Sequence, residues 1–158
     1  MSSTSGDDRD QLLKDLEQAR NELRASYQGL SDENMTRPGA VGDWSVKDVL
    51  SHIASWEEVT FPDLQRVARG DTPTLASFDL SKVDDWNAMV MSLRRNLPLD
   101  QVLRELDLGR RNLLNALAQL PDSALAEGQF ARGMLTICTV HDKEHTEDIS
   151  QWRQREGL

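Results

Sequence analysis

The sequence of 158 residues contains three histidines, and their positions suggest most of its possible chemistry. His141 and His145 are four residues apart, so on a helix their side chains point in nearly the same direction. His52 lies far upstream, among apolar residues spaced for the inner face of another helix. Two imidazoles from one helix and one from a facing helix supply three nitrogen ligands and leave one coordination position for water or substrate. The spacing therefore predicts an open metal site formed by His52, His141 and His145.

Four other residues bear on this site. Cys138, the only cysteine, precedes the histidine pair by about one turn, and its thiolate would close the site as a fourth ligand if the metal is zinc. Asp148 follows the pair and is expected to orient an imidazole N–H. Glu57, Glu144 and Asp148 are the candidate proton acceptors. The alternatives are a buried cysteine with no ligand role and carboxylates that only face solvent.

Residues 141–145 also read H-x-x-E-H, the inverted pattern of certain zinc metalloproteases, in which the glutamate is the general base. A bundle of helices offers no cleft for an extended peptide, so a protease is not expected. The sequence has no Ser-His-Asp arrangement and no glycine-rich phosphate loop, which leaves hydrolysis by a triad and nucleotide chemistry without support.

The elements that must position the histidines are helices. Apolar residues at three- and four-residue steps predict long helices over about 12–29, 46–69, 100–120 and 133–157, and a shorter one over 84–95. Ser45 followed by Asp48 resembles a capping box at the start of the second. Residues 31–43 contain proline and glycine without periodicity and are expected to form a connection. Four long amphipathic helices and one short helix in a long crossover describe a four-helix bundle.

Length and composition predict one all-α domain over residues 1–158, with about 1–7 as a flexible polar tail. A net charge of −9 and a pI near 4.8 oppose binding to nucleic acids and to anionic membranes. There is no apolar run long enough to span a bilayer and no secretory signal at the start. We therefore expect a cytoplasmic protein with no membrane partner.

Two motifs resemble a known family. Residues 42–58, GDWSVKDVLSHIASWEE, resemble the W-[ST]-x-x-[DE]-[VL]-[LI]-x-H-[IL]-x-x-W segment of DinB-like proteins, and residues 141–152, HDKEHTEDISQW, resemble their terminal HxxxHxxxIxxW. The pair Trp86–Asn87 and the leucine-rich third helix extend the resemblance over most of the chain. It implies an up-up-down-down four-helix bundle, commonly a homodimer, in which His52, His141 and His145 hold a divalent metal such as zinc or nickel.

The resemblance leaves the reaction open. Relatives include thiol-dependent transferases and isomerases as well as hydrolases, so we expect a metal-dependent enzyme acting on a small molecule, either an S-transferase with a low-molecular-weight thiol as cosubstrate or a hydrolase. The alternative is a non-catalytic bundle, a binding, stress-response or self-protection protein, in which a metal only ties two helices together. A metal with that role would have four protein ligands, and Cys138 is the residue that would complete them.

Overall fold

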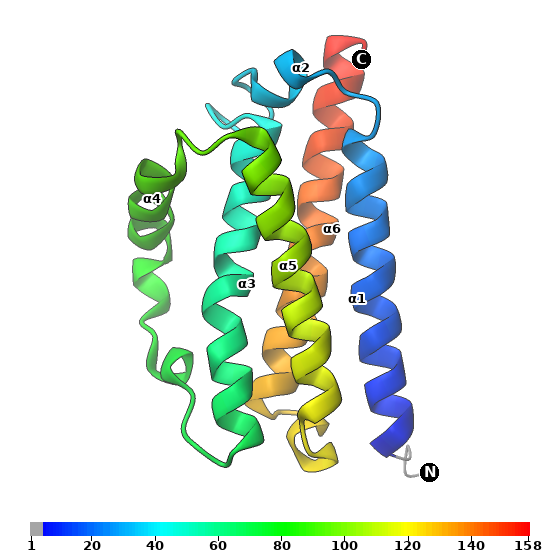
Figure 1. Cartoon of the computed structure of the whole chain (residues 1–158), viewed down its shortest axis with the longest axis vertical. Coiled ribbons are helices and arrows are strands. Elements are labelled where there is room, and N and C mark those ends of the chain that lie inside the picture. The colour runs from blue at the N-terminus through cyan, green and yellow to red at the C-terminus, as the bar shows by residue number, and fades with distance from the viewer. Residues whose placement is uncertain (1–4) are drawn as a thin grey trace.

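A computed structural model of the protein describes residues 5–158 and is built from helices (Figure 1). The helices are α1 (Ser5–Tyr27), α2 (Asp32–Thr36), α3 (Val46–Ala68), α4 (Val83–Arg94), α5 (Leu99–Gln119) and α6 (Phe130–Glu156), with short 3-10 turns η1 (Thr74–Ser77), η2 (Leu80–Lys82) and η3 (Asp122–Leu125). The predicted all-α class is confirmed. Residues 1–4 of the predicted polar tail lie outside the described residues, and α1 already begins at Ser5.

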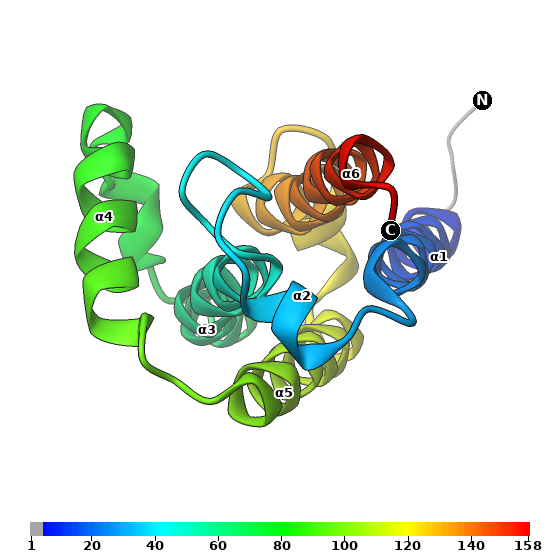
Figure 2. The ribbon, with the colours of Figure 1, turned by 90° about the horizontal axis from the view of Figure 1, so that it is seen from above.

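The four long helices surround a common core, and α4 lies outside them against α3 (Figure 2). Their directions differ from the expected up-up-down-down order. In Figure 1, α1 rises, α3 and α5 descend, and α6 rises. The reason is that residues 28–45 stay at one end of the bundle, so α3 must run back along α1, whereas only the crossover 69–98 returns the chain over the bundle's length. Two parallel pairs result, α3 with α5 and α1 with α6.

Local signals explain where these helices begin and end. Ser45 accepts a hydrogen bond from the Asp48 backbone while the Asp48 side chain accepts one from the Ser45 backbone, so the predicted capping box starts α3. Pro98 immediately precedes α5, and Pro121 follows its end. Within the connection 31–43, the structure adds the five-residue helix α2, which the sequence pattern did not predict.

The buried core has two halves, stacked along the bundle. One contains leucines near the start of α1 and the end of α5, and the other contains Leu23, Ile53, Ile149 and Trp152 together with neighbours on all four long helices. Burying these side chains is the main favourable contribution to folding. Among the described residues, no helix combines the length and the apolar character that crossing a membrane requires.

The crossover is attached to α3 through aromatic contacts. The Trp56 indole N–H donates a hydrogen bond of 2.9 Å to the side-chain oxygen of Asn87, and the rings of Trp56 and Trp86 lie 4.2 Å apart. Phe78 packs edge-on against Trp56 at 6.1 Å. The pair Trp86–Asn87, noted in the sequence, therefore holds α4 beside the helix that carries His52.

Candidate metal centre

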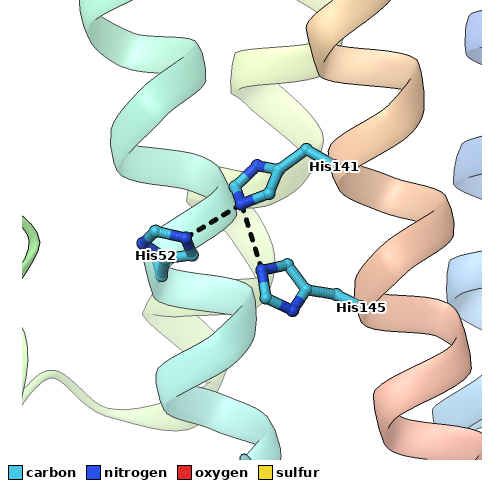
Figure 3. A group of neighbouring side chains, drawn as sticks. All are labelled: His52, His141 and His145. Atoms are coloured by element: carbon cyan, nitrogen blue, oxygen red, sulfur yellow. Dashed lines mark hydrogen bonds between the residues drawn. The ribbon is translucent and has the colours of Figure 1, made fainter. Parts of the chain in front are cut away.

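The three histidines meet between α3 and α6. Figure 3 shows His52 extending from α3 toward His141 and His145 on α6. The Nε2 atom of His141 lies 2.8 Å from Nε2 of His52 and 3.0 Å from Nε2 of His145. The three residues form a group in which each offers a ligand atom and all such atoms lie within 4.8 Å of one another. The structure thus brings together the three residues that the sequence selects as ligands.

The number of hydrogens available to the three ring nitrogens fits a bound cation better than a hydrogen-bonded cluster. His145 Nδ1 lies 3.1 Å from an Asp148 carboxylate oxygen, so a neutral His145 that donates there has an unprotonated Nε2. His141 Nε2 touches two other ring nitrogens but carries at most one hydrogen, so one of the two contacts has no hydrogen to share. A metal ion, by contrast, accepts the lone pairs of all three nitrogens at once.

Burial keeps two of these imidazoles neutral. It lowers the pKa of His52 to about 3, with a further contribution from His141 and His145 nearby. Burial, followed by the influence of His145, lowers the pKa of His141 to about 4. The ring of Trp44 lies 5.1 Å from that of His52, at a tilted angle. Neutral imidazole is the form that binds metal, so the folded protein presents His52 and His141 ready for coordination at neutral pH.

Cys138 does not join the histidines. Within residues 5–158 the ligand group contains the three histidines alone, although Cys138 precedes His141 by less than a turn. Its thiol is buried, and burial, together with the nearby Glu57 carboxylate, raises its pKa to about 12. The side chain instead belongs to the apolar core formed near η3.

Glu57 lies in a different cluster, a buried ion network that takes one residue from each long helix: Arg20 from α1, Glu57 from α3, Arg110 from α5 and Asp142 from α6. Glu57 Oε1 accepts hydrogen bonds from Arg20 at 2.7 Å and from Arg110 at 2.6 and 2.9 Å. Asp142 accepts from both arginines as well. Burial opposes the charge of Arg20, yet the two carboxylates outweigh it and raise its pKa. Glu57 is therefore engaged with two cations.

Sequence reasoning missed this network, although its helical spacing was readable. Arg20 stands between Leu16 and Leu23 at four- and three-residue steps, and Arg110 has the same relation to Leu106 and Leu113. An arginine at a core position of an apolar stripe indicates a buried partner, because an unpaired buried charge is costly. The network separates the two halves of the core along the bundle.

Glu144 borders a chamber beside the histidines. The chamber has a volume of about 420 Å³, and His141 and Glu144 form part of its wall together with residues of α3 and of the crossover. Glu144 is exposed, and the described residues provide no hydrogen bond or ion pair to its carboxylate. Of the three candidate proton acceptors, Glu144 alone faces this chamber without a partner, since Asp148 contacts His145.

A sequence profile described as the DinB superfamily matches residues 15–149. The chain belongs to this superfamily. Curated relatives carry the name "Putative metal-dependent hydrolase": one from Geobacillus thermodenitrificans is 26% identical over 85% of this chain and 78% of its own length. Another, from Bacillus mycoides, is 24% identical over 92% of this chain and 86% of its own. Metal dependence is thus suggested both by the names of relatives and by the histidine cluster.

Solved structures of similar shape support the fold alone. An uncharacterised protein from Escherichia coli UTI89 superposes with a TM-score of 0.80 at 13% identity, over 95% of both chains. The Sibling Lethal Factor precursor DfsB gives 0.79 at 13% identity over 98% of both. The colibactin self-resistance protein ClbS, solved with double-stranded DNA, gives 0.79 at 12% identity, over 92% of this chain and 95% of its own.

Proposed function

We propose that this protein is a metal-dependent hydrolase of small molecules, in which His52, His141 and His145 hold one divalent cation. The carrying observation is the convergence of three Nε2 atoms from two helices. Imidazole nitrogen suits zinc and nickel, the metals expected from the family resemblance. With three protein ligands, one position stays open, which is the usual arrangement of a catalytic site rather than a structural one.

A divalent metal held by His52, His141 and His145 would lower the pKa of a water or thiol ligand and so supply a nucleophile at neutral pH. The chain contributes the rest. Asp148 holds the ring of His145 in one tautomer and orientation through its contact with Nδ1. We assign the role of proton acceptor to Glu144, which lines the same chamber as His141. Trp44 packs beside the ring of His52 and restricts its orientation.

Thiol transfer is the second reaction that the same site would support, with a thiolate in place of hydroxide. Hydrolysis is better supported on two grounds. The relatives are named hydrolases. The chamber wall also carries no lysine or arginine among its described residues, and an acidic thiol cosubstrate would need such a cation.

The non-catalytic alternative depends on closing the site with a fourth protein ligand. Cys138, the expected fourth ligand, packs in the apolar core outside the histidine group. On our proposal, Cys138→Ser leaves metal affinity nearly unchanged. A loss of a hundredfold or more in that variant would instead support a structural metal.

Elemental analysis of tag-free protein, reconstituted with zinc or nickel, tests the proposal. We expect about one metal per chain in the natural protein and in Glu147→Gln, an exposed position on α6 that serves as control. His52→Ala and His145→Ala should each lose that metal. The loaded protein is then screened against esters, amides and lactams with and without low-molecular-weight thiols. Turnover that needs no thiol supports hydrolysis, turnover only with thiol supports transfer, and full metal in both histidine variants overturns the site.

A further inference from the structure

The chamber beside the histidines has the size and lining of a ligand site. Its volume of about 420 Å³ falls within the range of roughly 300–1,000 Å³ that small-molecule sites occupy. It lies between α3, α6 and the crossover segment that carries η1, η2 and the start of α4. Most of its wall is apolar, including Ile53, Trp56, Leu75, Phe78, Val83 and Ile137. Such a wall fits the hydrocarbon part of a small molecule.

The charged groups on this wall are of one sign. Glu57 and Glu144 contribute to the lining, whereas no lysine or arginine does so among the described residues. The charge of Glu57 is compensated, because Oε1 accepts hydrogen bonds from Arg20 and Arg110. The carboxylate of Glu144 has no such partner in the described part of the chain. The chamber therefore presents one uncompensated negative charge, at Glu144.

These features discriminate between ligands by charge. An anion entering an apolar chamber loses hydration and meets the Glu144 carboxylate without gaining a cationic partner. A neutral group meets no such repulsion. A cation is attracted by the Glu144 carboxylate.

We propose that this chamber binds the apolar part of a ligand that is uncharged or cationic there, with its reactive group directed toward His141, and that it discriminates against anions. The inference rests on the proposed function only in assigning the ligand to the histidine site. Binding in the chamber itself requires no metal, so the two proposals fail separately.

Metal-free, tag-free protein is titrated with three probes that share a naphthalene body, namely naphthalenemethanol, naphthylmethylammonium and naphthoate. Tryptophan fluorescence reports binding because Trp56 lies in the wall, and calorimetry confirms it. We expect the alcohol and the ammonium to bind at least tenfold more tightly than the naphthoate. Equal or tighter binding of naphthoate overturns the proposal, and so does the absence of binding by all three probes.

Variants then assign the effect to the chamber. Glu144→Gln should bring the affinities of the ammonium and the alcohol together, and Glu144→Lys should favour naphthoate. Glu147→Gln, exposed on the same helix and absent from the lining, should change none of the three. Ile137→Asp adds a charge at a wall residue that is 57% exposed, so the fold tolerates it while the alcohol binds more weakly. If both Glu144 variants keep the probe preferences of the natural protein, the inference is contradicted. If the protein binds the probes as expected but takes up no metal, only the hydrolase proposal is contradicted.

Discussion

The histidine cluster and the ion network are two groups of interior polar side chains, and they differ in how their charges and protons are balanced. The network joins two arginines to two carboxylates, so its formal charges cancel inside the bundle, although Glu57 Oε2 has no hydrogen-bond partner among the described residues. The histidine cluster brings three like nitrogens together with too few hydrogens to share. A group whose charges cancel needs no added ion, whereas a group of converging lone pairs is completed by a cation. The histidine cluster therefore indicates an ion site, and the network does not.

Breaking the network should produce the largest effect. Arg110→Met leaves Glu57 and Asp142 buried with one cation between them, and we expect a loss of roughly 3–5 kcal/mol in the free energy of unfolding, measured by urea denaturation. Arg104→Met, on the same helix in an exposed pair with Asp100, is the control and should cost at most about 1 kcal/mol.

A double variant sharpens the interpretation. Removing Glu57 together with Arg110, both to methionine, leaves the pair Arg20–Asp142 intact and balanced. The double variant should be more stable than Arg110→Met alone. If it is less stable, the network acts through packing rather than through charge balance.

Removing the metal should have the next largest effect on stability, and this effect should depend on the histidine cluster alone. When the free metal concentration is about a hundredfold above the dissociation constant, metal binding stabilises the folded state by about 2.7 kcal/mol. A chelator should therefore lower the thermal midpoint of the metal-loaded protein and leave that of His145→Ala unchanged. A shift of the same size in His145→Ala would mean that the metal binds elsewhere.

Asp148→Ala tests the support of the cluster. The variant removes the carboxylate that contacts His145 Nδ1, and loss of such a partner usually weakens metal binding about 10–100-fold. Competition with a zinc indicator measures the change. Glu147→Gln provides the comparison, and equal affinity in the two variants would show that Asp148 does not orient the ligand.

Acid should destabilise the metal-free protein through the histidines. An unfolded histidine takes up its proton near pH 6.5, but burial lowers the folded-state pKa of His52 to about 3 and of His141 to about 4. At pH values between the folded-state pKa and about 6.5, the unfolded state binds more protons than the folded state. The free energy of unfolding therefore decreases as the pH is lowered through this range, by up to about 1.4 kcal/mol per pH unit for each histidine. Urea denaturation at several pH values checks this, and His52→Gln should show a shallower slope. A protein that becomes more stable toward pH 5 would contradict it.

The smallest predicted effect concerns the tightness of the network. A Cβ at Gly109 would lie 3.1 Å from Glu57 Oε2, and the hydrogen bonds of Oε1 prevent Glu57 from moving away. Gly109→Ala should therefore destabilise by about 1 kcal/mol, although alanine is intrinsically favoured in helices by about that amount. Gly133→Ala, where nothing lies within 4 Å, should instead stabilise, as thermal unfolding would reveal. The same sign at both positions would argue against close packing around Glu57.

Helix positions and inward faces were predictable because both follow from local periodicity. The capping box at Ser45 and the stops near Pro98 and Pro121 are local as well, and the helices begin and end close to those residues. Helix direction was not predictable. The length of a connection does not tell whether it stays at one end of the bundle or crosses it, and the expected up-up-down-down order was wrong for that reason. Homodimer formation and the lack of nucleic-acid binding stay predictions.

The sequence by itself determined which side chains face inward, because a helical period assigns His52, His141 and His145 to buried stripes whatever lies opposite. Only the tertiary structure decided which inward residues meet. It brought three histidines together, kept Cys138 in the apolar core and paired Glu57 with two arginines. The physical reason is that periodicity is a property of one helix, whereas a site depends on the height and rotation at which several helices pack.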